Sequence, residues 1–144
     1  MPQSKEERLQ NINELVPGLR DAGIELGEIY LDPLVYPVSV DVSNGPKVIE
    51  TIRTLRETYG EAVHFAPGLS NVSHGFPKRN VINQVFAKLC CDAGCDGGIV
   101  DPAQINDAVL AGIDYTDEIT RLARDVLLGK DEYGMTFISA VRGG

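Results

Sequence analysis

The stretch Ile29-Tyr30-Leu31-Asp32-Pro33 decides the fold of this chain. Its apolar residues do not alternate with polar ones, which predicts a short strand covered on both faces. Asp32 follows this strand and begins the next loop. The same ending returns at residues 97–102, where a short run of small and apolar residues again leads to Asp-Pro. Residues 63–66 are strand-like too. We therefore predict three short buried strands.

Segments with helical periodicity separate these strands. Ser4 and Glu7 have the spacing of a capping box at the start of the first helix, and Pro17 is expected to kink that helix or end it early. Further helices are predicted at residues 43–60 and 78–94. Residues 103–142 have a helical pattern with no further strand, including a last short helix from about Glu132.

This alternation of helices and strands is typical of parallel β/α architecture. Three strands cannot close a (β/α)8 barrel, which needs eight strands and about 250 residues. We therefore predict a single α/β domain over residues 1–144 that is only part of a TIM barrel.

Composition excludes several classes of function. An apolar content of 43% supports a packed core rather than a disordered tail. The net charge of −8 is spread along the chain, which argues against nucleic acid as a partner. The sequence has neither a membrane-spanning apolar run nor a signal-peptide pattern at its amino terminus. We expect a cytoplasmic protein with no membrane partner.

Three cysteines cluster in one helical segment and its exit. Cys90, Cys91 and Cys95 lack Cys-x-x-Cys spacing, and their number is odd. We interpret them as reduced core thiols and expect no metal site. A metal or redox role is the alternative.

Two aspartates follow predicted strands at the edge where parallel β/α proteins carry their functional residues. Asp32 and Asp101 each precede a proline, so each could simply cap the next turn. Their equivalent positions on either side of a polar loop favour binding instead. A carboxylate can accept two hydrogen bonds side by side from a ring N–H and an exocyclic amine, which is the pattern that a pterin presents.

The loop of residues 68–75 lies between these aspartates. Gly68 and Ser70 are small and allow close backbone approach to a ligand. The Asn71 amide both donates and accepts hydrogen bonds, so it can hold a ring nitrogen before and after protonation. His74 adds an imidazole that could act as a general acid. The alternative is an ordinary loop that caps the next helix, and we interpret His64, within a strand, as structural.

The same residues carry a resemblance to a known family, the methyltetrahydrofolate:corrinoid methyltransferases. Its signature is similar to residues 68–73, 77–79, 82–83, 93–96 and 99–102, and residues 30–39 resemble the segment one strand earlier. The resemblance implies a (β/α)8 barrel related to dihydropteroate synthase, with the pterin at the carboxyl ends of the strands. This chain would be the C-terminal half, with the last three strand-helix units plus the C-terminal helices.

The resemblance also implies roles for single residues. In the family, the aspartate matching Asp32 binds the pterin ring, and the asparagine matching Asn71 reaches N5, which makes Asn71 the expected catalytic residue. Gly68 and Ser70 help to shape the loop. The resemblance gives His74 no fixed role. The expected substrate-binding residues are Asp32, Gly68, Ser70, Asn71, His74 and Asp101.

The implied reaction moves the methyl group of methyltetrahydrofolate from N5 to Co(I) of a corrinoid, a cobalamin-type cofactor carried by a partner corrinoid protein. Earlier strands of the family contribute another aspartate and an asparagine to the pterin, and this sequence does not replace them. We therefore expect activity to need the missing half. The open edges of a half-barrel also predict a homo-oligomer or pairing with that half.

Two other interpretations remain. One is a pterin enzyme of the dihydropteroate synthase type, although the basic residues expected for a pyrophosphate-leaving substrate are not evident. The other is a non-catalytic half-barrel that docks on a corrinoid protein or assembles with itself.

Overall fold

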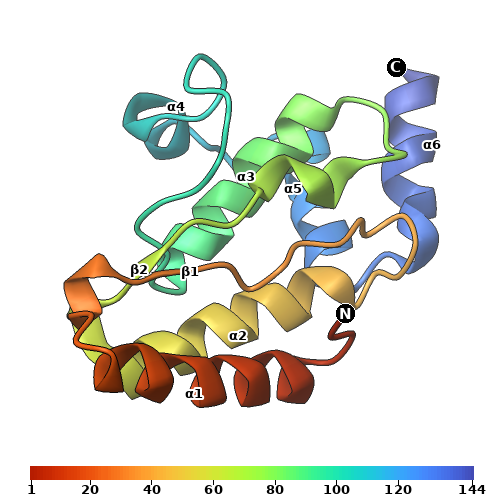
Figure 1. Cartoon of the computed structure of the whole chain (residues 1–144). Helices are drawn as coiled ribbons and strands as arrows, with labels where there is room; N and C mark the ends of the chain where they lie inside the picture. Colours follow the sequence, from red (N-terminus) through yellow and green to blue (C-terminus); the bar gives the residue numbers. More distant parts are fainter.

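The fold is described by a computed structural model that covers all 144 residues. It combines helices with a small parallel sheet, which confirms the predicted α/β class (Figure 1). The elements are α1 (Lys5–Asp21), η1 (Leu26–Glu28), β1 (Tyr30–Leu31), α2 (Asn44–Tyr59), η2 (Gly60–Ala62), β2 (His64–Phe65), η3 (Leu69–Ser73), α3 (Arg79–Asp92), α4 (Asp107–Ala111), α5 (Glu118–Leu127), η4 (Glu132–Gly134) and α6 (Met135–Gly143), where η marks a 3-10 helix.

The sheet contains two of the three predicted strands. β1 and β2 run parallel, with Tyr30 opposite His64 and Leu31 opposite Phe65. The third predicted strand, residues 97–100, is wrong in extent, because only an isolated bridge joins Ile99 to Gly68. Two consecutive glycines open that segment, and glycine weakens a strand because it has no side chain to pack and loses much backbone freedom.

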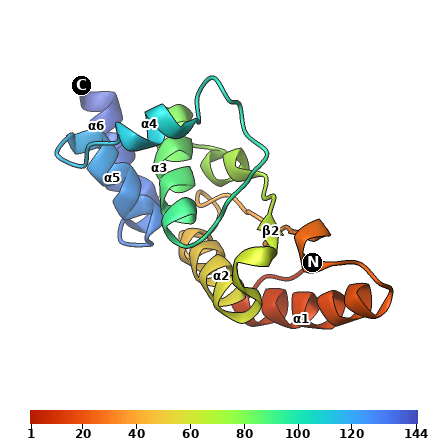
Figure 2. The ribbon, with the colours of Figure 1, turned by 90° about the vertical axis from the view of Figure 1, so that its left-hand side faces the viewer.

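The helices lie along one face of the sheet. α1, α2, α3, α5 and α6 follow one another in an arc, each packed against the next (Figures 1 and 2). Leu31 and Phe65 are buried, whereas Tyr30, whose side chain projects from the other face, is exposed. One connected cluster of buried apolar side chains therefore joins the sheet to the helices.

The capping box of α1 is confirmed. The Ser4 hydroxyl accepts a hydrogen bond of 3.1 Å from the Glu7 amide, and the Glu7 carboxylate accepts one of 3.2 Å from the Ser4 amide. The predicted early end at Pro17 is wrong, because α1 continues to Asp21. Ile12 and Val16 bury one face of α1, and this packing outweighs the single backbone hydrogen bond that proline removes.

The C-terminal helices are held close to the rest of the molecule. A Cβ atom added at Gly45 in α2 would lie 2.2 Å from the carbonyl oxygen of Leu127, the last residue of α5. α6 begins at Met135, three residues after the predicted start, because Tyr133 takes a left-handed conformation with φ of 54°. No helix combines the length and hydropathy that crossing a bilayer requires.

The cysteines are all free, as predicted, but only two of them belong to the core. Cys90 and Cys95 are buried, whereas Cys91 is exposed. Burial raises the pKa of the Cys95 thiol to about 11. The interpretation of Cys91 as a core thiol is therefore wrong. Helical geometry turns adjacent residues about 100° apart, so Cys90 and Cys91 cannot face the same side.

Candidate functional site

Two loops meet at the carboxyl ends of β1 and β2. Because the strands are adjacent and parallel, residues 32–39 after β1 and residues 68–75 after β2 leave the sheet at the same edge. Two hydrogen bonds join the loops, one of 3.0 Å from the Val38 amide to the Val72 carbonyl and one of 2.6 Å from the Ser39 hydroxyl to the His74 carbonyl. The loops therefore form one continuous rim.

A hollow of about 460 Å³ opens between the two loops, and we call it the rim pocket. It is the largest hollow of the molecule and has the size of a small-molecule site. Its polar lining comes from Asp32, Asn71 and His74, with Gly68 between them, and its apolar lining includes Val35 and Ile99. Four of the six candidate residues thus line one pocket.

Asp32 lies on the rim pocket with an exposed side chain. Its Oδ1 atom accepts a hydrogen bond of 2.9 Å from the Leu34 amide, so the carboxylate does cap the turn that follows β1. Its Oδ2 atom has no hydrogen-bond partner within the protein. Because each carboxylate oxygen can accept more than one hydrogen bond, Asp32 can cap this turn and still receive two donors from a ligand.

Asn71 lies across the pocket in η3, and its side chain is exposed and makes no hydrogen bond within the protein. Both the amide oxygen and the amide nitrogen are therefore free to contact a ligand. A Cβ atom added at Gly68 would lie 3.2 Å from the Asn71 Nδ2 atom. Glycine at position 68 leaves that amide room to turn.

The remaining two candidates lie elsewhere. Ser70 and Asp101 line a second hollow of about 330 Å³ at the start of α3, which we call the α3 pocket. The Asp101 carboxylate accepts hydrogen bonds of 3.0 Å from the Ala103 amide and from the side chain of Gln104. Both of its oxygens therefore stabilise the local turn, and the structure does not bring Asp101 to the rim pocket.

The second histidine has a different setting. The His64 Nδ1 atom lies 2.6 Å from the Asp96 Oδ2 atom, and the imidazole stacks on the Tyr30 ring at 4.9 Å. Burial raises the pKa of Asp96, but hydrogen bonds from His64 and the Phe65 amide outweigh this and lower it. These contacts tie β2 to the segment after α3, which agrees with a structural role for His64.

Sequence reasoning missed one residue near this site. Arg8 in α1 is only 2% exposed, and its Nη2 atom donates a hydrogen bond of 3.2 Å to the Leu34 carbonyl, in the wall of the rim pocket. A signal was present in the sequence, because Arg8 precedes Ile12 and Val16 at spacings of four residues, which places it in the apolar stripe of the helix.

No family model matches the chain. Over all 144 residues it is 27% identical to the methylcorrinoid:tetrahydrofolate methyltransferase of Eubacterium limosum, of which it covers 49%. Over 89 residues, 58% of the chain, it is 33% identical to the methionine synthase of Mycobacterium tuberculosis, of which those residues cover 7%. The methionine synthase of Mycobacterium leprae matches to the same extent. The predicted resemblance is confirmed, and the chain spans about half the length of the first relative.

Proposed function

From this similarity we propose that the chain is one half of an enzyme that transfers a methyl group between N5 of a tetrahydrofolate and the cobalt of a corrinoid protein. One observation carries the proposal: Asp32 and Asn71 come from loops after adjacent parallel strands and line the same pocket with free hydrogen-bonding atoms. The sequence similarity alone does not identify the site, since the chain covers only 49% of the first relative.

The pocket residues suit the pterin end of such a substrate. The free Oδ2 atom of Asp32 can accept hydrogen bonds from ring N–H and amino groups, while the Asn71 amide can donate to N5. When the N5–CH3 bond breaks, the methyl group passes to the acceptor, the bonding electron pair stays on N5, and N5 takes up a proton from solvent to give tetrahydrofolate. A donor placed at N5 stabilises that developing charge and so lowers the barrier.

The corrinoid fits outside this pocket rather than in it. A hollow of about 460 Å³ suits a bicyclic pterin and is too small for a macrocycle. For transfer from methyltetrahydrofolate, a corrinoid on the partner protein would supply Co(I) as the nucleophile towards the methyl carbon. The residues of the rim pocket would hold the methyl donor, and the partner protein would bring the cobalt to the open side of this pocket.

The direction of transfer remains part of the proposal. The resemblance to the family implies transfer from methyltetrahydrofolate to cobalt, whereas the name of the Eubacterium limosum relative places methylcorrinoid before tetrahydrofolate. The forward and reverse reactions share one transition state, so an enzyme that stabilises it lowers the barrier in both directions equally. Activity should therefore be measured from each side.

In the same proposal, the chain forms the last three strand-helix units of a (β/α)8 barrel together with its C-terminal helices. Support comes from the parallel pairing of β1 with β2 and from the parallel bridge between Gly68 and Ile99, since neighbouring strands of such a barrel are parallel. Ser70 and Asp101, in the α3 pocket, would then contact only a part of the substrate that extends beyond the pterin ring.

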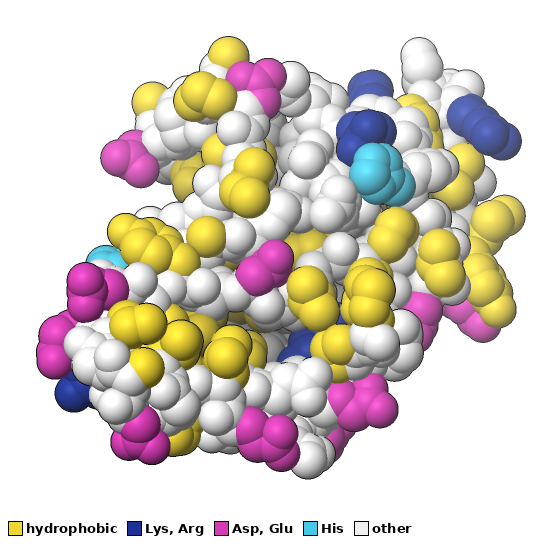
Figure 3. Space-filling model, in the orientation of Figure 1, with side chains coloured by type: hydrophobic (Ala, Val, Ile, Leu, Met, Phe, Trp, Pro, Cys, Tyr) yellow, Lys and Arg dark blue, Asp and Glu magenta, His cyan; other side chains and the backbone are white.

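A second candidate is a non-catalytic module that docks on a corrinoid protein or on a second copy of itself. It is favoured by the apolar side chains on the face shown in Figure 3 and by the exposure of Tyr30 and Ile99, which are 65% and 70% exposed. Such exposure beside an open strand edge promotes association. Sedimentation of the wild type and of a Tyr30→Lys, Ile99→Lys double variant, each alone and with a corrinoid protein, tests it. A wild type that stays monomeric alone and does not bind the corrinoid protein contradicts it.

The main proposal is tested by titrating the chain with methyltetrahydrofolate and with tetrahydrofolate, alone and together with a polypeptide that corresponds to the other half of the Eubacterium limosum relative. We expect weak binding by the chain alone and methyl transfer to a corrinoid protein only in the mixture. Micromolar binding by the chain alone would show that the other half is not needed for the pterin. Absence of both binding and transfer in the mixture would refute the proposal.

A further inference from the structure

The wall of the rim pocket contains an unusual backbone conformation at Leu34. Its φ of 58° lies in the left-handed region, which residues with a Cβ atom rarely adopt. The Leu34 amide is also the donor to Asp32 Oδ1, at 2.9 Å. The orientation of the Asp32 carboxylate therefore depends on a turn that would not keep its shape without support.

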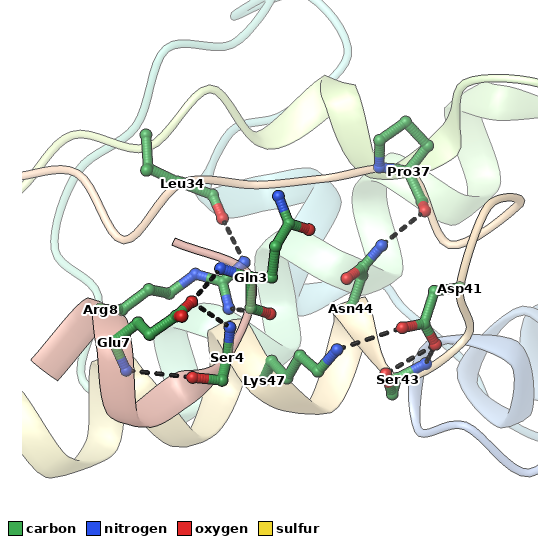
Figure 4. A network of polar contacts seen from close by, with 10 residues as sticks. All are labelled: Gln3, Ser4, Glu7, Arg8, Leu34, Pro37, Asp41, Ser43, Asn44 and Lys47. Carbon is green, nitrogen blue, oxygen red and sulfur yellow. Dashed lines mark hydrogen bonds and ion pairs between the residues drawn. The ribbon is translucent and has the colours of Figure 1, made fainter. Parts of the chain in front are cut away.

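Arg8 provides that support from α1. Its Nη2 atom donates a hydrogen bond of 3.2 Å to the Leu34 carbonyl, as Figure 4 shows, and its guanidinium carbon lies 5.1 Å from the centre of the Tyr36 ring. The Tyr36 hydroxyl in turn donates a hydrogen bond of 3.0 Å to the Pro2 carbonyl. One buried side chain thus contacts the wall at two of its residues.

The surroundings of Arg8 are unusual for a buried cation. No carboxylate lies within ion-pair distance of it, and its other hydrogen bond, of 3.4 Å, goes to the Gln3 carbonyl. Its Nε atom is buried without a partner, and burial lowers the pKa of the guanidinium. Burial of an unpaired charge costs free energy, and an apolar side chain of similar volume would avoid that cost.

The far end of the wall has a second buried anchor, from α2. The Asn44 side chain donates a hydrogen bond of 3.0 Å to the Pro37 carbonyl (Figure 4). The segment from Leu34 to Pro37 is therefore held at both ends by side chains of two different helices. Only the Arg8 end is connected through Leu34 to the carboxylate of Asp32.

We propose that Arg8 is a positioning residue for the rim pocket: its guanidinium fixes Leu34 and Tyr36 and thereby aims the Asp32 carboxylate at the ligand. The inference rests on the proposed function, because it assumes that Asp32 binds the pterin. It explains why a charge is buried without a counter-ion at this place. A lysine has a single ammonium and cannot donate to Leu34 while lying flat on Tyr36.

The test compares Arg8→Met and Arg8→Lys with Arg53→Met, a matched control because Arg53 is exposed on α2 and forms neither a hydrogen bond nor an ion pair. Weak affinities for tetrahydrofolate are measured by NMR titration of the full chain. We expect binding to weaken about tenfold in Arg8→Met, the equivalent of one hydrogen bond to a charged group, and not to change in the control. Arg8→Lys should resemble Arg8→Met.

A second readout does not depend on the ligand. The order parameter of the Leu34 amide should fall from about 0.85 to below about 0.6 in Arg8→Met, while that of His64 in β2 stays unchanged. In Arg8→Ala, millimolar ethylguanidinium should restore both the Leu34 order parameter and the affinity, which a general loss of stability would not allow.

The outcomes separate the two proposals. If Arg8→Met changes neither the affinity for tetrahydrofolate nor the order parameter of the Leu34 amide, the proposed role of Arg8 is overturned. If the wild type does not bind tetrahydrofolate even with the other half of the relative present, the proposed function fails. The order parameter of the Leu34 amide, and its recovery with ethylguanidinium in Arg8→Ala, then still show whether Arg8 holds the turn.

Discussion

The Ser39 hydroxyl donates a hydrogen bond of 2.6 Å to the carbonyl of His74 and so closes the rim between the two loops of the candidate site. The next residue, Gly75, has φ of 88°, and a Cβ atom there would lie 2.9 Å from the Ser39 Oγ atom. The closure between the loops therefore requires a residue without a side chain at position 75. This requirement can be tested.

Gly75→Ala is expected to lower the free energy of unfolding by about 1–2 kcal/mol, because alanine is strained at this positive φ. Gly18→Ala is the matched control: Gly18 lies within α1 with no atom near the added methyl group, so this change should raise stability by about 0.5–1 kcal/mol. Urea denaturation measures both. Equal effects of the two variants would contradict the explanation.

The ionised Asp41 carboxylate should contribute to the free energy of unfolding near neutral pH and lose that contribution in acid. Hydrogen bonds from the Ser43 side chain and amide, together with Lys47, lower the pKa of Asp41 from 3.8 to about 2. Because the folded pKa is the lower one, this contribution is complete above pH 3.8 and is lost as the pH falls towards 2. Solvent exposure of the carboxylate keeps the contribution small.

Asp41→Asn should therefore reduce the fall in unfolding free energy between about pH 5 and pH 2. Asp21→Asn, at the exposed end of α1, is the charge-matched control, because it also removes one carboxylate but none of the contacts of Asp41. Chemical denaturation at a series of pH values supplies the comparison. An identical pH profile for the wild type and Asp41→Asn would exclude this role.

The three thiols should differ in reactivity. Cys91 is exposed, whereas Cys90 and Cys95 are buried. Burial raises the pKa of all three thiols, so access to the reagent distinguishes Cys91 from the other two. A disulfide reagent at pH 8 should label one thiol per native chain and three after unfolding. Cys91→Ser should abolish the native labelling. Rapid native labelling of Cys91→Ser would show that the helix opens more readily than its packing indicates.

Asn71→Ala should separate catalysis from docking. If Asn71 donates to N5 as the bond breaks, methyl transfer by the reconstituted enzyme should fall about 100-fold, the loss typical for removal of one such donor. The thermal unfolding midpoint should change little, because the Asn71 side chain is exposed and makes no hydrogen bond within the protein. Asn11→Ala on the exposed face of α1 is the control. Unchanged transfer in Asn71→Ala would favour the docking module.

The sequence predicted those features that depend on local patterns. Residues 29–31 and 63–66 were predicted as strands and contain β1 and β2, and the spacing of Ser4 and Glu7 was sufficient to identify the capping box. The meeting of Asp32 and Asn71 at one pocket could be expected too, because adjacent parallel strands end at the same edge. Their roles in chemistry remain predictions.

Features that depend on tertiary packing could not be predicted in this way. Asp101 has the same Asp-Pro sequence as Asp32, yet its carboxylate is occupied by Ala103 and Gln104, which only the loop conformation determines. Helical spacing places Arg8 in line with Ile12 and Val16, but it does not identify the acceptor of Arg8, the Leu34 carbonyl, which lies 26 residues away in the chain. Local patterns contain no information on such distant partners.

Because Gly45 lies so close to Leu127, the residue types tolerated at position 45 report whether the C-terminal helices are packed against α2. Any side chain there would push α5 away from α2. Among randomised codons at position 45, only glycine should survive a selection for folded protein as long as the terminal helices remain docked. If α5 and α6 are dispensable, the same selection should return many residues.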